Sequence, residues 1–200
     1  TCGSGPNGAG KQEQGITVEE GGDMDFVPDQ AVRHGDIIEG GNWSVECVYT
    51  PGHTSNHMCF ALREEKALFT GDHVMGWSTS IISPPDGDMA DYMSSLDLLL
   101  QRDDVVYWPT HGPCIDEPKN HVRAFIQHRE EREAQILGCI EQGVHNIRDM
   151  VPMMYRDTPE FMYPAAARSV LAAMENLLKK QQVTIASGAG LEGDYRRVAD

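Results

Sequence analysis

The sequence predicts an α+β fold in two parts, a mostly antiparallel sheet with a covering helix and a following winged-helix-like module. Short β-prone runs crowd residues 36–70, a helix and a strand alternate between residues 88 and 109, and helical periodicity dominates from residue 117 onward. The chain has 200 residues, 40% of them hydrophobic. That length suffices for one medium domain, or for a truncated domain plus a small second one.

Four β-prone runs follow one another with short connections, at residues 36–39, 43–49, 58–62 and 67–70. The second run alternates, which places Trp43, Val45, Cys47 and Tyr49 on one face. Consecutive strands with tight turns predict an antiparallel meander. Residues 1–30 are instead polar and rich in glycine, so we expect an irregular segment there.

A helix should follow the meander, with Asp88 as its N-cap. The apolar residues behind it recur at helical spacing: Met89, Tyr92, Met93, Leu96, Leu99 and Leu100. Residues 105–108 then return as an apolar strand that ends at Pro109. The helix should cover one face of a mixed sheet whose loops collect at one end.

Three helices and a hairpin are expected after residue 117. The first is charged and runs to about residue 137, the second buries Ile147, Met150, Val151 and Met154, and the third opens at Pro164. Residues 183–185 and 195–198 flank a glycine-rich turn. We therefore predict a domain at residues 1–117 and, at residues 118–200, a linking helix with a winged-helix-like domain.

Charge and cysteine content narrow the class of protein. The net charge is −15, and residues 1–117 hold 5 Lys/Arg against 20 Asp/Glu while residues 118–200 hold 11 of each. This acidity disfavours a nucleic-acid surface on the first part unless bound metal reverses it. The five cysteines are scattered and include no Cys-x-x-Cys pair, which fits neither a disulfide framework nor a structural zinc cluster. No apolar run is long enough to span a membrane. We therefore expect a cytoplasmic protein.

Three segments carry residues suited to a metal: residues 50–57 with His53, residues 69–73 with Asp72, and residues 109–113 with His111. In each, a strand runs into a glycine-containing turn that holds the His or Asp. Imidazole and carboxylate suit zinc, and one carboxylate can bridge two ions about 3.5–4 Å apart. A single His in a turn is usually structural, but the three motifs together predict side chains that converge at one end of the sheet.

The motifs TPGHT with a following His, FTGD and PTHGP resemble the later motifs of the metallo-β-lactamase superfamily. The branch is that of hydroxyacylglutathione hydrolase and a mitochondrial lactamase-like endoribonuclease; similarity to the latter extends from Gly35 to Val183. The resemblance implies the second half of an αββα sandwich. It also implies that His53 binds a first zinc, that Asp72 bridges and is catalytic, and that His111 binds a second zinc.

The superfamily's first motif, His-x-His-x-Asp-His, is absent from residues 1–200. Each ion would therefore have only two protein donors, one fewer than a catalytic zinc usually needs. Because the chain starts at Thr1 with a glycine-rich opening, we expect its gene to begin upstream. We expect His57 and His73 to support the ligands or the local turns rather than to bind metal.

Other segments are less specific. Residues 5–11 match a phosphate loop, but Gln12 follows where Ser or Thr should stand, which argues against nucleotide binding. The methionines at 150, 153, 154 and 162 fit a helix core better than a partner groove. Residues 76–86 follow Asp72, so this segment either shapes substrate access or is simply a loop.

The leading hypothesis is a zinc-dependent hydrolase of a thioester, ester or phosphodiester, with a small molecule and RNA both open as substrates. Alternatives are a non-catalytic fragment that self-associates and a winged-helix nucleic-acid binder, although residues 164–180 contain only Arg168, Lys179 and Lys180 as cations. We expect a homodimer through one apolar sheet face, built from Trp43, Val45, Cys47, Phe60, Leu62, Leu68 and Val106.

Overall fold

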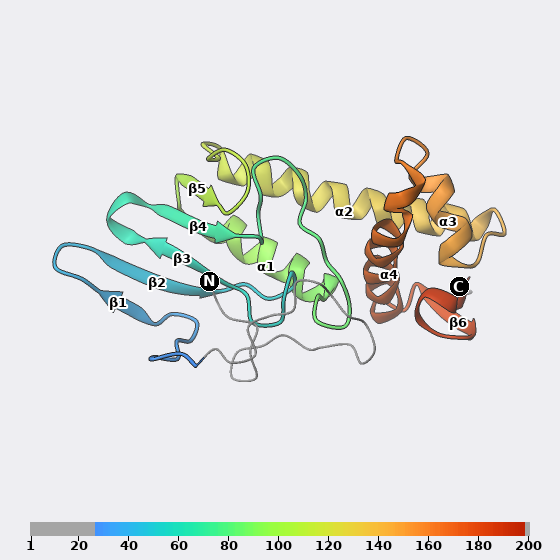
Figure 1. Cartoon of the computed structure of the whole chain (residues 1–200), viewed down its shortest axis with the longest axis horizontal. Coiled ribbons are helices and arrows are strands. Elements are labelled where there is room, and N and C mark those ends of the chain that lie inside the picture. The colour runs from blue at the N-terminus through green and yellow to red at the C-terminus, as the bar shows by residue number, and fades with distance from the viewer. Residues whose placement is uncertain (1–26, 199–200) are drawn as a thin grey trace. The chain divides into compact units, whose positions relative to one another are not determined.

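The computed structural model describes residues 27–198, and these residues form two compact units (Figure 1). The first unit extends to Ile81 and includes Pro85–Phe125, and the second contains Ile82–Pro84 and the chain from Ile126 onward. The residues of the phosphate-loop match, and most of the glycine-rich segment, lie outside the described part. Helix α2 (Pro118–Glu141) continues from the first unit into the second, so the boundary near residue 117 stays a prediction.

Five strands form the sheet of the first unit in the order β1-β2-β3-β4-β5 (Figure 1). Their bounds are Ile37–Glu39, Ser44–Tyr49, Met58–Leu62, Ala67–Gly71 and Val106–Pro109. The first four pair in antiparallel fashion, and β5 pairs with β4 in parallel. The predicted meander and mixed sheet are therefore present.

Helix α1 (Met89–Gln101) packs on one face of this sheet. Its N-cap is Asp88, whose Oδ1 accepts the amide hydrogens of Ala90 at 2.9 Å and Asp91 at 3.1 Å. The hydroxyl of Tyr107 in β5 donates to the Leu99 carbonyl, which joins this helix to the sheet. The fully or almost fully buried apolar side chains between them are Val48, Cys59, Ala61, Leu68, Tyr92, Leu96, Leu99 and Tyr107.

One residue of the predicted apolar face was placed wrongly. Leu68 pairs with Ala61 and Tyr107, so it belongs to the face covered by α1. The neighbouring Phe69 pairs with Phe60, and it therefore occupies the opposite face. Because side chains alternate along a strand, an assignment shifted by one residue exchanges the two faces.

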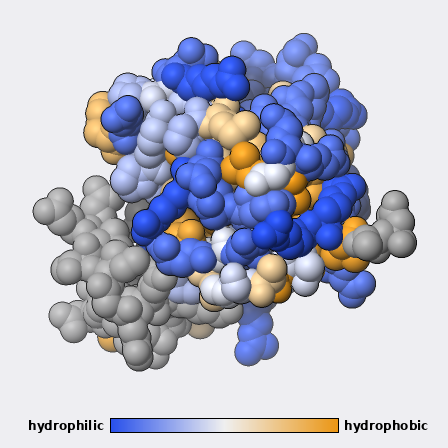
Figure 2. Space-filling model, turned by 90° about the vertical axis from the view of Figure 1, so that its right-hand side faces the viewer, coloured by the Kyte–Doolittle hydropathy of each residue, from blue (hydrophilic) through white to orange (hydrophobic). Residues whose placement is uncertain are grey.

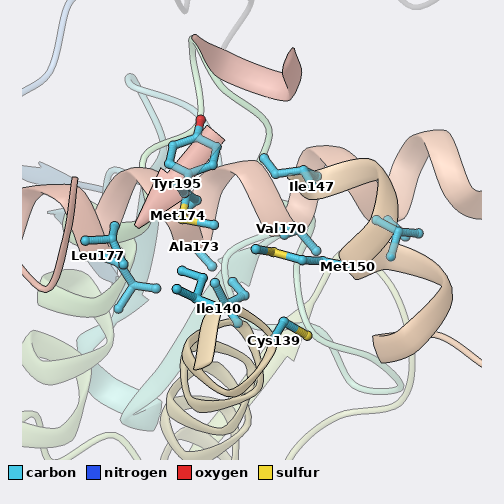
Figure 3. Packing of buried hydrophobic residues seen from close by; sticks show 13 residues of the cluster. Cys139, Ile140, Ile147, Met150, Val170, Ala173, Met174, Leu177 and Tyr195 are labelled. Atoms are coloured by element: carbon cyan, nitrogen blue, oxygen red, sulfur yellow. The ribbon is translucent and has the colours of Figure 1, made fainter. Parts of the chain in front are cut away.

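The second unit is a helical module with a terminal hairpin. Its elements after α2 are α3 (Ile147–Met154), α4 (Tyr163–Lys179), β6 (Val183–Ser187) and β7 (Asp194–Arg197). Figure 3 shows its core, where Met150, Val170 and Met174 lie close together, each at most 1% exposed. Met150 confirms the predicted helix core, whereas Met162 is 43% exposed in a 3-10 turn before α4, so its assignment to the core was wrong.

A buried carboxylate joins two helices of the second unit. Glu133 of α2 accepts hydrogen bonds from Asn176 Nδ2 at 2.6 Å and from Lys180 Nζ at 2.7 Å. Glu133 and Asn176 are both buried. A buried charge persists only with such partners, so this contact fixes the packing of α2 against α4.

Within residues 27–198, no helix is both long and apolar enough to cross a membrane. The face in Figure 2 is mainly hydrophilic, and its apolar side chains form small, separate groups.

We expect Leu96→Ala to destabilise the first unit by about 3 kcal/mol, because Leu96 is fully buried and the change leaves a cavity under the sheet. Asp97→Ala, at the next, exposed position of α1, should change stability by less than about 0.5 kcal/mol. All three tryptophans belong to this unit, so urea denaturation followed by tryptophan fluorescence measures its unfolding. An equal decrease in the free energy of unfolding in both variants would contradict the packing of Leu96 described here.

Candidate metal centre

The predicted ligands all follow strands that run in the same direction. Strand β2 is antiparallel to β3, which is antiparallel to β4, and β5 is parallel to β4. Strands β2, β4 and β5 therefore end at the same edge of the sheet. Asp72 follows β4 directly, His111 lies two residues after β5, and His53 lies four residues after β2.

The structure brings the three side chains together around Asp72. His53 Nε2 lies 3.8 Å from Asp72 Oδ2, and His111 Nε2 lies 3.5 Å from Asp72 Oδ1. Each carboxylate oxygen thus faces a different imidazole. Asp72 Oδ1 is buried and accepts no hydrogen bond. A buried carboxylate oxygen without a hydrogen-bond donor is suited to a cation.

A backbone carbonyl orients His53. The Ile81 carbonyl oxygen lies 2.6 Å from His53 Nδ1. Because a carbonyl can only accept, Nδ1 donates in this contact, and Nε2 is the ring nitrogen that faces Asp72. Metal-binding histidines are commonly held by this kind of contact.

The turn that carries His53 is fixed to helix α1. Gly52 has a φ of +133°, and a Cβ at this position would lie 2.3 Å from the Tyr92 Cα. The Asp88 amide donates to the Gly52 carbonyl at 2.9 Å. Only glycine allows this close approach of turn and helix, so the position of His53 depends on α1.

His57 packs beside the three residues. Its Nδ1 lies 2.9 Å from the hydroxyl of the buried Thr50, and its ring centroid lies 6.2 Å from that of His53. The pKa of His57 is lowered to about 4, mainly by burial and also by the nearby His53, while Asp72 and a hydrogen bond with Thr50 oppose the change. His57 is therefore uncharged at neutral pH. Gly71 makes room for it, since a Cβ there would lie 2.7 Å from His57 Nε2.

His73 is fully buried and lies beside His57. Its ring centroid lies 5.4 Å from that of His57 and 4.6 Å from that of Tyr92. Its carbonyl oxygen accepts hydrogen bonds from the hydroxyls of Tyr92 and Ser80. These contacts hold the turn after β4, which is compatible with the supporting role predicted for both histidines.

The donors suit a two-metal centre in type and arrangement but supply only part of one. Each ion would receive one imidazole nitrogen and one oxygen of Asp72, whereas a catalytic zinc usually has three protein ligands. Within residues 27–198, no group of three or more His, Cys, Asp or Glu side chains could hold a metal ion. The ligand roles of His53, Asp72 and His111 stay predictions.

Two contacts of the site had no sequence signal. Ile81 acts through its backbone carbonyl, which any residue type could provide. Trp77 lies in the segment after Asp72, and its ring is stacked on that of His111, with centroids 6.0 Å apart and planes 10° apart. The sequence marked this segment only by its position in the chain.

Comparisons with known proteins agree with the two-part organisation. Residues 4–111 match the metallo-beta-lactamase superfamily, and residues 147–189 match the beta-lactamase associated winged helix domain. A "Beta-lactamase-like protein 2 homolog" of Drosophila melanogaster is 35% identical over 157 residues, which cover 77% of this chain and 51% of the fly protein. The "Lactamase-like protein nscB" of Arthroderma benhamiae is 32% identical over 179 residues, covering 82% of this chain and 40% of the fungal protein.

Solved structures share the fold. A beta-lactamase domain protein from Burkholderia ambifaria matches with a TM-score of 0.75 and 20% identity, over 88% of this chain and 55% of its own. A metallo-beta-lactamase family protein from Thermus thermophilus matches with a TM-score of 0.70 and 20% identity, over 84% of this chain and 54% of its own. The chain spans about half the length of the relatives it matches.

We expect Asp72→Ala to weaken zinc binding at least tenfold, roughly the minimum cost of disturbing a metal site, because it removes a donor from both ions. His53→Ala and His111→Ala should each weaken binding of one ion. His145→Ala is the control, since this histidine contacts Tyr195 in the second unit. Equilibrium dialysis with metal analysis measures the effect, and wild-type affinity retained by Asp72→Ala would reject the assignment.

Proposed function

Since the chain belongs to the metallo-β-lactamase superfamily, we propose that it forms part of a zinc-dependent hydrolase of a thioester, ester or phosphodiester. The observation that carries the proposal is the placement of Asp72, whose two oxygens face His53 and His111 separately. Members of this superfamily generally bind metal ions. Because the chain spans about half the length of its relatives, the activity of the whole protein is part of the proposal.

Each of the two ions would be bound by a different histidine and a different oxygen of Asp72. His53 Nε2 and one oxygen of Asp72 would bind the first, and His111 Nε2 and the other oxygen would bind the second. Zinc, when bound, lowers the pKa of a bound water toward neutrality and polarises a carbonyl or phosphoryl oxygen. The Ile81 carbonyl and the Trp77 ring keep the two imidazoles in position for this role.

A small ester or thioester is favoured over RNA as the substrate. The acidity of residues 1–117 opposes a polyanion. Two cations of α4 and its C-cap also have partners: Arg168 donates to the Ser83 hydroxyl at 2.6 Å, and the C-cap residue Lys180 donates to Glu133 at 2.7 Å. These contacts weaken the case for α4 as a nucleic-acid recognition helix.

A cytoplasmic location is also part of the proposal. Four of the five cysteines lie in the described residues, and all four are free thiols: Cys47, Cys59, Cys114 and Cys139. Free thiols are typical of a reducing compartment.

Self-association is the second property that we propose. On the sheet face opposite α1, Phe69 is 46% exposed and Trp108 is 47% exposed, and the two are paired in register. Exposed aromatic side chains on one strand pair favour burial against another surface. A second copy related by a two-fold axis needs only this one self-complementary face.

We expect the isolated chain to hydrolyse substrates at a rate close to background, because each ion has two protein donors instead of three. Any turnover should require zinc and should disappear in Asp72→Ala. A panel of simple esters, thioesters and phosphodiesters, assayed with and without zinc, tests this. Turnover that persists in the variant or without metal would exclude the proposed chemistry, and tight binding of two zinc ions with rapid turnover would refute the incomplete site.

We expect light scattering at micromolar concentration to report about twice the 22.1 kDa mass of one chain. Replacing Phe69 and Trp108 by Lys should convert the dimer to a monomer, since charges would have to be buried in the interface. Phe161→Lys is a matched control, because Phe161 is 80% exposed in the second unit. A monodisperse wild-type monomer would contradict self-association.

A further inference from the structure

The segment between Asp72 and the start of α1 is fixed against the turn that carries His111. The Gly76 amide donates to the His111 carbonyl at 2.8 Å. A Cβ on Gly76 would lie 2.4 Å from the Pro113 carbonyl oxygen, and a Cβ on Gly112 would lie 2.8 Å from the Gly76 carbonyl carbon. The two backbones therefore touch, and this contact determines where the next residue, Trp77, is held.

Two large apolar residues of this segment contact the predicted ligands, one through its ring and one through its backbone, and both have exposed side chains. Trp77 is 71% exposed although its ring is stacked on His111, and Ile81 is 61% exposed although its carbonyl contacts His53. Each predicted histidine ligand thus has an exposed apolar residue next to it. Apolar side chains held at a site by backbone contacts are suited to bind an apolar group of a ligand.

The polar groups of the same segment do not favour an anionic substrate. Residues 72–88 contain no Lys or Arg, so this segment offers no cation to a phosphate. Its two carboxylates after Asp72 have structural contacts: Asp86 accepts from the Ser55 amide, and Asp88 caps α1. What the segment presents beside the centre is therefore an indole ring and an aliphatic side chain.

We infer that Trp77 and Ile81 form an apolar rim of the metal centre that binds a flat, apolar group of the substrate next to its scissile carbonyl. The inference rests on the proposed hydrolase function and narrows the substrate to an ester or thioester with an aromatic or similarly flat apolar acyl group. Trp77 provides a ring face for stacking, and Ile81 provides the aliphatic contact. Both are specificity-determining residues.

The test compares two carboxylates that mimic the acid released by such a hydrolysis and differ only in a flat apolar group, 2-naphthylacetate and acetate. NMR titration of the chain gives both affinities, with and without zinc. Three tryptophans give three indole N–H signals, so the signal that moves reports the location of binding. We expect 2-naphthylacetate to bind at least about fivefold more tightly than acetate and to shift the Trp77 signal.

Variants separate a role of the ring from a general effect on the fold. Trp77→Ala should lose the preference for 2-naphthylacetate, and Trp77→Phe should keep part of it, because a smaller ring still stacks. Trp43→Ala, which removes a half-exposed tryptophan of the β1–β2 turn, should keep the full preference. Equal affinity for the two carboxylates, or a preference that survives Trp77→Ala, would overturn the inference.

Zinc binding measured on the same samples distinguishes the two proposals. A preference for 2-naphthylacetate in a chain that binds no zinc would support the rim and reject the metal centre. Zinc binding without this preference would leave the hydrolase proposal in place and reject the rim.

Discussion

The common direction of strands β2, β4 and β5 is the constraint on which the candidate site depends. A side chain placed just after each strand lies at the same edge of the sheet, and in this chain those side chains are His53, Asp72 and His111. The direction of β5 is set by α1, which returns the chain to the far end of the sheet so that β5 pairs with β4 in parallel. Without this crossover, His111 would lie at the opposite edge from Asp72.

The sequence predicted the elements whose patterns are local. The N-cap at Asp88, the apolar spacing of α1 and the alternation in β2 each depend on residues a few positions apart. The assignment of Leu68 to the apolar face was wrong. In a short strand whose successive residues are all apolar, the sequence does not show which of the two faces a given residue occupies. The pairing of Phe69 with Phe60 on the neighbouring strand shows which face of β4 packs against α1.

Prediction of the site was limited in the same way, because local motifs could be recognised but contacts between distant residues could not. The β-prone runs and the turns that follow them placed the three candidate ligands at strand ends, the motif resemblance supplied their roles, and the structure brings them close together. The contacts that position them join residues distant in sequence and involve backbone atoms or ring faces. The Ile81 carbonyl next to His53 and the Trp77 ring on His111 are examples, since neither role requires a residue type that marks it in advance.

The attachment of the His53 turn to α1 also bears on the order in which the fold and the metal site form. Gly52 touches the backbone of Tyr92, and its carbonyl accepts the amide of Asp88, so the turn belongs to the same hydrogen-bonded unit as the core helix. In small zinc domains the metal supplies the free energy of folding, and removing it unfolds the chain. Here the arrangement of the donors is maintained by apolar packing. We therefore expect a chelator to leave the fold intact, with the three proposed donors still arranged as they are in this structure.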